Sequence, residues 1–140
     1  MNYELLSYAM PKIMEHEGLR LKPYKCPAGK LTIGYGRNLE ARGITKQEAY
    51  TLAENDIRDS IFQCEKNFSD FFSKLSVGRK YVLVDMVFNM GINGLLGFKK
   101  TLNFIRQGNY ESASIEMLNS LWAKQVGNRA ITLSKIMKEG

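Results

Sequence analysis

One predicted helix of about 20 residues constrains the fold more than any other part of this 140-residue chain. The stretch Thr45-Lys46-Gln47-Glu48 has the form of a capping box, in which a threonine caps the helix and a glutamate three residues later reaches back to it. Small and apolar residues then recur at helical spacing, namely Ala49, Leu52, Ala53, Ile57, Ser60, Ile61 and Cys64. Such a helix is about 30 Å long, which is long for a domain of this size. We therefore expect residues 46–66 to form a helix that bridges two lobes.

The segment before this helix predicts a small sheet. Apolar residues alternate with period two in two short runs, Leu19, Leu21 and Tyr24, then Leu31, Ile33 and Tyr35. Proline and glycine residues divide these runs into a hairpin-like arrangement. Because two or three short strands are marginal alone, they must lean on helices. We place this small lobe at about residues 16–44.

The remainder of the chain indicates helices. An N-terminal stripe of Leu5, Leu6, Ala9, Ile13 and Met14 stops at Gly18, and Pro11 leaves open a start at Asn2 with a kink or a start near Ser7. Ser76 to Met90 carries Val77, Tyr81, Val84, Val87 and Phe88 on one side, and further helices are expected from Thr101, after Asn109 and after Asn128. The predicted fold is α+β and mostly helical. It is one two-lobed domain over residues 1–140, whose helical lobe comprises about residues 76–140 plus the N-terminal helix.

Composition narrows the possible partners. The chain has 20 Lys plus Arg against 14 Asp plus Glu, a net charge of +6, which favours an anionic partner. The positive charges are scattered, and no nucleic-acid-binding signature is visible among them. With one histidine, His16, and two cysteines, Cys26 and Cys64, a metal site is not expected, and Cys64 fits a small buried residue. No signal pattern begins the chain and no run reaches the roughly 18 apolar residues of a membrane span, since Asp85 interrupts the most apolar stretch.

Three side chains with reactive groups fall close together in the sequence. Glu17 is followed by Cys26 and then by Thr32, in a stretch punctuated by glycines. A carboxylic acid beside a small nucleophilic or basic group suits acid–base cleavage of an acetal. Glu17 is also expected at a helix C-terminus, where the helix dipole disfavours a carboxylate and raises the pKa.

The order Glu17, Cys26, Thr32 and Ile33-Gly34-Tyr35-Gly36 resembles the phage-type lysozymes, the endolysins of glycoside hydrolase family 24. The resemblance continues in register through later blocks, at residues 45–49, 86–91, 97–98, 122 and 128–129. It implies a two-lobed fold and hydrolysis of the β-1,4 bond between N-acetylmuramic acid and N-acetylglucosamine in bacterial peptidoglycan. It implies no cofactor. The basic surface then has a natural partner in the anionic wall.

The resemblance also implies roles for individual residues. Glu17 matches the general acid, and Arg129 matches the arginine that faces it and would lower its pKa, against the effect of the helix end. Cys26 stands where many members carry aspartate, and two interpretations stay open: a base or water-orienting group, or a covalent nucleophile. Thr32 is expected to hold the attacking water. His16 is expected to be a partly exposed helix residue.

Further positions match the family pattern with differences. Arg37 stands where histidine is usual, and we hypothesise that it forms an ion pair with Asp56 on the long helix. Trp122 matches a core position and is assigned to packing only. Five residues match positions that line the cleft or contact saccharide, namely Asn38, Phe88, Asn89, Phe98 and Thr101.

These interpretations favour a monomeric muramidase that lyses a bacterial host, with peptidoglycan as its partner, no nucleic-acid function and no membrane insertion. It would be made in the host cytoplasm and act on the wall after membrane permeabilisation. Two alternatives remain: a lytic transglycosylase, which uses one acid and no water, and a non-catalytic basic module that binds cell wall or nucleic acid.

Overall fold

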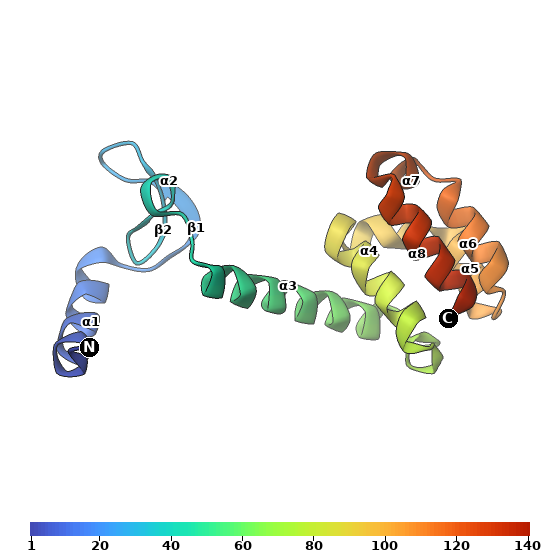
Figure 1. Cartoon of the computed structure of the whole chain (residues 1–140), viewed down its shortest axis with the longest axis horizontal. Helices are drawn as coiled ribbons and strands as arrows, with labels where there is room; N and C mark the ends of the chain where they lie inside the picture. Colours follow the sequence, from blue (N-terminus) through green and yellow to red (C-terminus); the bar gives the residue numbers. More distant parts are fainter. The chain divides into compact units, whose positions relative to one another are not determined.

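The computed structural model describes residues 1–140, which divide into two compact units, residues 1–50 and 51–140 (Figure 1). The first unit holds helix α1 (Tyr3–Glu17), strands β1 (Arg20–Lys25), β2 (Leu31–Gly34) and β3 (Arg37–Asn38), and the short helix α2 (Leu39–Arg42). Helix α3 (Lys46–Asn67) begins in the first unit and continues into the second. The fold is therefore mostly helical α+β with a small sheet near the N-terminus, as predicted.

Helix α1 settles the alternatives that Pro11 left open. The Asn2 side chain accepts a hydrogen bond from the Leu5 N–H at 2.9 Å, so the helix starts at the earlier of the two positions and runs through Pro11. It stops at Gly18, whose N–H donates to the Met14 carbonyl. None of its residues is buried. Its assignment to the helical lobe stays a prediction.

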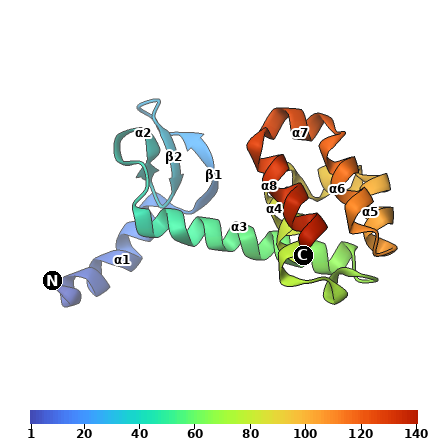
Figure 2. The ribbon, with the colours of Figure 1, turned by 45° about the vertical axis from the view of Figure 1, so that its right-hand side comes forward.

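The predicted hairpin-like sheet is confirmed. The three strands are antiparallel in the order β1-β2-β3, with Tyr24 opposite Thr32 and Thr32 opposite Asn38. Figure 2 shows β1 and β2 side by side. A tight turn joins β1 to β2, because the Cys26 N–H donates to the Lys30 carbonyl at 2.9 Å. The pairing is irregular between Arg20 and Tyr24, where β1 carries extra residues. This register places Cys26 at the turn and Thr32 on the neighbouring strand.

The capping box at the start of α3 is confirmed. The Thr45 N–H donates to Glu48 Oε1 at 2.8 Å, and the Glu48 N–H donates to Thr45 Oγ1 at 3.1 Å. Two of the N–H groups that a helix start leaves without partners are thereby satisfied. The helix is 22 residues long, close to the expected length.

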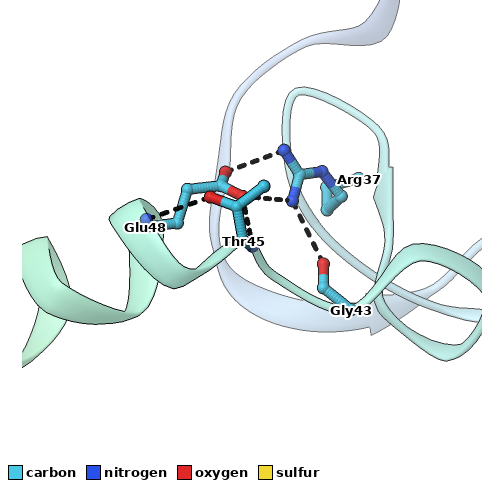
Figure 3. Close-up of polar contacts among 4 residues, drawn as sticks. All are labelled: Arg37, Gly43, Thr45 and Glu48. Atoms are coloured by element: carbon cyan, nitrogen blue, oxygen red, sulfur yellow. Dashed lines mark hydrogen bonds and ion pairs between the residues drawn. The ribbon is translucent and has the colours of Figure 1, made fainter.

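The expected ion pair between Arg37 and Asp56 is wrong, because Arg37 binds Glu48 instead (Figure 3). The guanidinium donates to both oxygens of Glu48, at 2.9 and 2.7 Å, and to the Gly43 carbonyl at 3.1 Å. Asp56 lies eight residues further along α3, about 12 Å along the helix axis. The Glu48 carboxylate is already fixed beside β3 by the capping box, so it is the group that Arg37 reaches.

The second unit is a cluster of helices around one apolar core. It comprises the rest of α3, a short 3-10 turn η1 (Phe72–Lys74), α4 (Val77–Leu96), α5 (Lys99–Arg106), α6 (Tyr110–Leu118), α7 (Leu121–Val126) and α8 (Asn128–Glu139). The range of α4 contains a kink at Gly91, whose non-helical φ of 80° and ψ of 163° separate two helical segments. Asn109 caps α6 as predicted, whereas Asn128 lies one residue inside α8 and Gly127 takes the cap position. The predicted start of α5 was two residues late.

The predicted core face of α4 is largely wrong. Its buried residues are Val82, Leu83, Met86, Val87 and Leu95. Of the expected stripe only Val87 is buried, whereas Val77 is 83% exposed and both Tyr81 and Phe88 are exposed. The run from Tyr81 to Phe88 is apolar on more than one face, so helical period alone does not select the face that packs.

Two further features fix this unit. Cys64 is buried, as predicted, and burial raises the pKa of its thiol to about 12. Arg79 donates to the carbonyls of Met137 and Lys138 at 2.8 and 2.9 Å, which ties α4 to the end of α8, where a cation is favourable.

By length and hydropathy no single helix could cross a bilayer, although the bent pair α4 and α5 passes the same test together.

The pairing of Glu48 makes the stability of the protein dependent on acid pH. The pKa of Glu48 is lowered from 4.5 to about 2, chiefly by the Arg37 guanidinium and then by the Thr45 N–H. Because the folded pKa lies below the unfolded one, the stabilisation is present above about pH 4.5 and is lost as the pH falls toward about 2. We expect Glu48→Gln to lower the melting temperature near neutral pH and to flatten its fall over this window, measured by circular dichroism. The control is Glu40→Gln, since Glu40 meets Lys30 only at 3.8 Å. Equal effects of both substitutions would contradict this account.

Candidate active site

The carboxylate of Glu17 lies against the turn between β2 and β3. Glu17 is the last residue of α1, and the chain turns at Gly18 into the sheet. A Cβ atom added to Gly36 would stand 2.5 Å from Glu17 Oε2 and 2.9 Å from its Cδ. Gly36 also has a φ of 74°, which side-chain-bearing residues rarely adopt. A side chain at this position would therefore displace the end of the Glu17 side chain from the place it takes against the turn.

Cys26 lies in the turn between β1 and β2 and is partly exposed. The pKa of its thiol is lowered, chiefly by a backbone hydrogen bond from Lys30 and then by one from Ala28, with the Thr32 hydroxyl contributing less. Backbone N–H groups that converge on a sulfur favour the thiolate, which is the basic and nucleophilic form. The turn geometry thus gives Cys26 more anionic character than an ordinary thiol.

Thr32 is 4% exposed and lies beside this turn. Its hydroxyl donates to the Lys30 carbonyl at 2.8 Å. A hydroxyl has one proton and two acceptor lone pairs, so Thr32 can still accept from a thiol or a water, or turn its proton toward a thiolate. The structure therefore brings Cys26 and Thr32 together, and separately brings Glu17 to Gly36, all within the first unit.

Arg129 lies in the first turn of α8 in the second unit. Its Nε–H donates to Asp85 Oδ1 at 2.7 Å, and Asp85 Oδ2 accepts from the Tyr81 hydroxyl at 2.9 Å. The same bond to Asp85 raises the pKa of Tyr81. The sequence analysis did not identify Asp85 as the partner of Arg129, although a carboxylate in the most apolar stretch of the chain was a signal that it is paired.

The candidate saccharide contacts differ in accessibility. Phe88 is 46% exposed and lines a hollow of about 430 Å³. Asn89 accepts the Trp122 indole N–H on its Oδ1 at 2.9 Å, which leaves its amide nitrogen as a donor. Phe98 and Thr101 line a second hollow of about 370 Å³, where Thr101 is buried and Phe98 packs edge-on to Trp122. Trp122 is buried, as its assignment to packing predicts.

Asn38, the candidate in the first unit, has a local structural role. Its Oδ1 accepts the Ala41 N–H at 3.0 Å and caps α2. The side chain is partly buried, and its amide nitrogen remains as a donor.

A mostly helical α+β chain with a small sheet, and with a carboxylic acid held at a glycine turn next to that sheet, belongs to the lysozyme class of folds. The sequence matches the family described as phage lysozyme over residues 14–137. It is 30% identical to "Probable T4-type lysozyme 1" of Dictyostelium discoideum, over 89% of each chain. It is 32% identical to "Endolysin" of Acyrthosiphon pisum secondary endosymbiont phage 1, over 84% of this chain and 80% of that one. It is also 28% identical to "Pre-baseplate central spike protein Gp5" of Enterobacteria phage T4, over 89% of this chain but only 26% of that protein.

The chain therefore belongs to the phage lysozyme family and is an enzyme with lysozyme activity. Membership implies bacterial peptidoglycan as the substrate. Because the family consists of lysozymes, the alternative of a non-catalytic basic binding module is rejected.

The contact between Glu17 and Gly36 gives a matched test. Gly36→Ala and Gly34→Ala both place a side chain at positive φ, 74° and 69°, so both should cost about 1–2 kcal/mol of stability. Only at Gly36 does the new Cβ meet the Glu17 carboxylate, since at Gly34 nothing lies within 4 Å. We expect Gly36→Ala to lower peptidoglycan-clearing activity by at least about 10-fold more than Gly34→Ala, measured at equal folded fraction. Equal activity of the two variants would show that this contact does not position the acid.

Proposed function

We propose that the protein is an endolysin that hydrolyses the β-1,4 bond between N-acetylmuramic acid and N-acetylglucosamine, for lysis of a bacterial host. The observation that carries the proposal is the Glu17 carboxylate lying against Gly36, within the residues that match the phage lysozyme family. Two relatives, "Endolysin" and "SAR-endolysin", support the lytic role. No cofactor takes part in the proposal.

In this proposal Glu17 is the general acid. It donates its proton to the glycosidic oxygen as the bond to the anomeric carbon breaks, and positive charge develops on the sugar ring. Glu17 is the last residue of α1, directly before the turn at Gly18 that leads into the sheet. Arg129 is proposed as a positive charge that stabilises the carboxylate left after the proton is donated.

Cys26 and Thr32 are proposed to activate and position the attacking water. The lowered pKa of Cys26 and the spare acceptor capacity of Thr32 support this role. The water gives a proton to the sulfur and its oxygen bonds to the anomeric carbon, so neither residue becomes covalently attached to the sugar. The rival route, attack by the Cys26 sulfur itself, would form a glycosyl-enzyme that water must then cleave.

The remaining assignments complete the proposal. Five residues are proposed to contact saccharide, Asn38, Phe88, Asn89, Phe98 and Thr101. The exposed ring of Phe88 and the hollow beside Thr101 support this for the second unit. The net charge of +6 suits an anionic wall. We propose a monomeric enzyme, working as one lysozyme domain over residues 1–140, made in the host cytoplasm and reaching the wall once the membrane is permeabilised.

A glutamine at position 17 tests the acid directly. Glu17→Gln keeps the size of the side chain but cannot donate the proton, so we expect activity on permeabilised cells to fall by at least about 100-fold. Glu15→Gln is the matched control, because it makes the same change on the same exposed helix two residues earlier. Glu15→Gln should clear walls as fast as the unmodified protein. Persistent activity of Glu17→Gln would end the proposal that this residue is the acid.

A further inference from the structure

Asp85 is a carboxylate in an apolar setting. It interrupts the run from Tyr81 to Phe88 on α4, and its side chain is only 13% exposed. Withdrawing a carboxylate from water is costly unless it is paired and hydrogen-bonded. We therefore expect Asp85 to be paired. Aspartate is also a weak helix former, so helix propensity does not explain why it stands in α4.

Both oxygens of Asp85 are engaged. Oδ1 accepts the Nε–H of Arg129 from α8, 44 residues later in the chain, and Oδ2 accepts the hydroxyl of Tyr81 one turn earlier on α4. At 2.7 Å the bond to Arg129 has the length of a strong charge-assisted hydrogen bond. The aspartate is thus fixed by its own helix and in turn holds a residue on another.

The atom that is held determines what Arg129 can still do. The bond uses Nε, the nitrogen nearest the side-chain stem, which fixes the direction of the planar guanidinium. The two terminal nitrogens, with four N–H bonds, remain for oxygen atoms outside this pair. Arg129 is also 39% exposed, so these nitrogens are accessible to a ligand or a carboxylate.

We propose that Asp85 is a positioning residue for Arg129 in the lysozyme reaction. By binding Nε and leaving the terminal nitrogens open, it presents the guanidinium in one orientation. The inference rests on the proposed role of Arg129 and adds to it the residue on which that role depends. Tyr81 contributes by orienting the aspartate.

The second unit contains a matched ion pair. Arg106 Nε binds Asp70 Oδ2 at 2.9 Å, and the Arg106 side chain is 39% exposed, the same fraction as Arg129. Neither residue of this pair is among the candidate site residues. Asp70 is 57% exposed, against 13% for Asp85, so Asp70→Ala controls for the loss of an arginine–aspartate pair, and the melting temperatures account for the difference in burial.

The test compares Asp85→Ala, Asp85→Asn and Asp70→Ala in the full chain, with a soluble peptidoglycan fragment as substrate. We expect Asp85→Ala to lower kcat/KM by between about 10- and 100-fold, because Arg129 loses its fixed orientation. Asp85→Asn keeps an acceptor for Nε and should recover part of the loss. Asp70→Ala should have normal kinetics. Melting temperatures are measured in parallel to confirm that each variant is folded.

Two readouts separate positioning from a structural role. The Arg129 Nε–H signal in nitrogen-15 NMR should be lost or exchange-broadened in Asp85→Ala but kept in Asp70→Ala. In combination with Arg129→Ala, Asp85→Ala should cause no further loss of kcat/KM, because it acts through the arginine. Normal kcat/KM in Asp85→Ala, or losses that multiply in the double variant, would overturn the inference. The proposed function fails by a different result, retained cleavage in Glu17→Gln.

Discussion

One carboxylate, that of Glu48, joins the sheet to the long helix. Its Oε1 accepts the Thr45 N–H that opens α3, and its two oxygens together receive the guanidinium of Arg37 from β3. A three-stranded sheet with strands of six, four and two residues has little stability of its own. The same side chain therefore starts the helix and anchors the last strand, and the turns that carry Cys26 and Gly36 depend on that strand arrangement.

The chemistry of the site depends on the same small unit. Two turns position the candidate groups. The turn between β2 and β3 brings Gly36 against Glu17, and the turn between β1 and β2 directs backbone hydrogen bonds at the Cys26 sulfur. In the proposed mechanism, this arrangement lets Cys26 act on the attacking water. Backbone hydrogen bonds lower the pKa of the thiol and move it toward the anionic form that an aspartate has without help.

Much of the fold followed from local patterns in the sequence. The capping box and the period of α3 are short-range signals, and both were predicted correctly. The alternation located the strands, but not their buried positions, since Leu31 is exposed and Thr32 is buried. The candidates Glu17, Cys26 and Thr32 also came from spacing, supported by the family resemblance. Patterns of this kind work because the groups that stabilise a helix start or a hairpin are near neighbours in the chain.

What the sequence did not reveal depends on contacts between distant residues. Arg37 was paired with Asp56 on the strength of the family pattern, and only the fold shows that Glu48 is the carboxylate within reach. The packed face of α4 could not be identified from a run that is apolar on more than one face. Likewise, only the fold shows that Asp85 binds Arg129 and that Gly36 lies against Glu17.

The central claim is that Glu17 protonates the glycosidic oxygen while a water held at Cys26 and Thr32 attacks the anomeric carbon. The most direct measurement is the chemical form and anomeric configuration of the first product, followed by proton NMR during cleavage of a defined peptidoglycan fragment. The water route yields a reducing muramic acid with inverted configuration, both in the unmodified enzyme and in Cys26→Asp. Retained configuration in the unmodified enzyme would show that the Cys26 sulfur bonds to the sugar. A 1,6-anhydro end would show that no water takes part and that the enzyme is a transglycosylase.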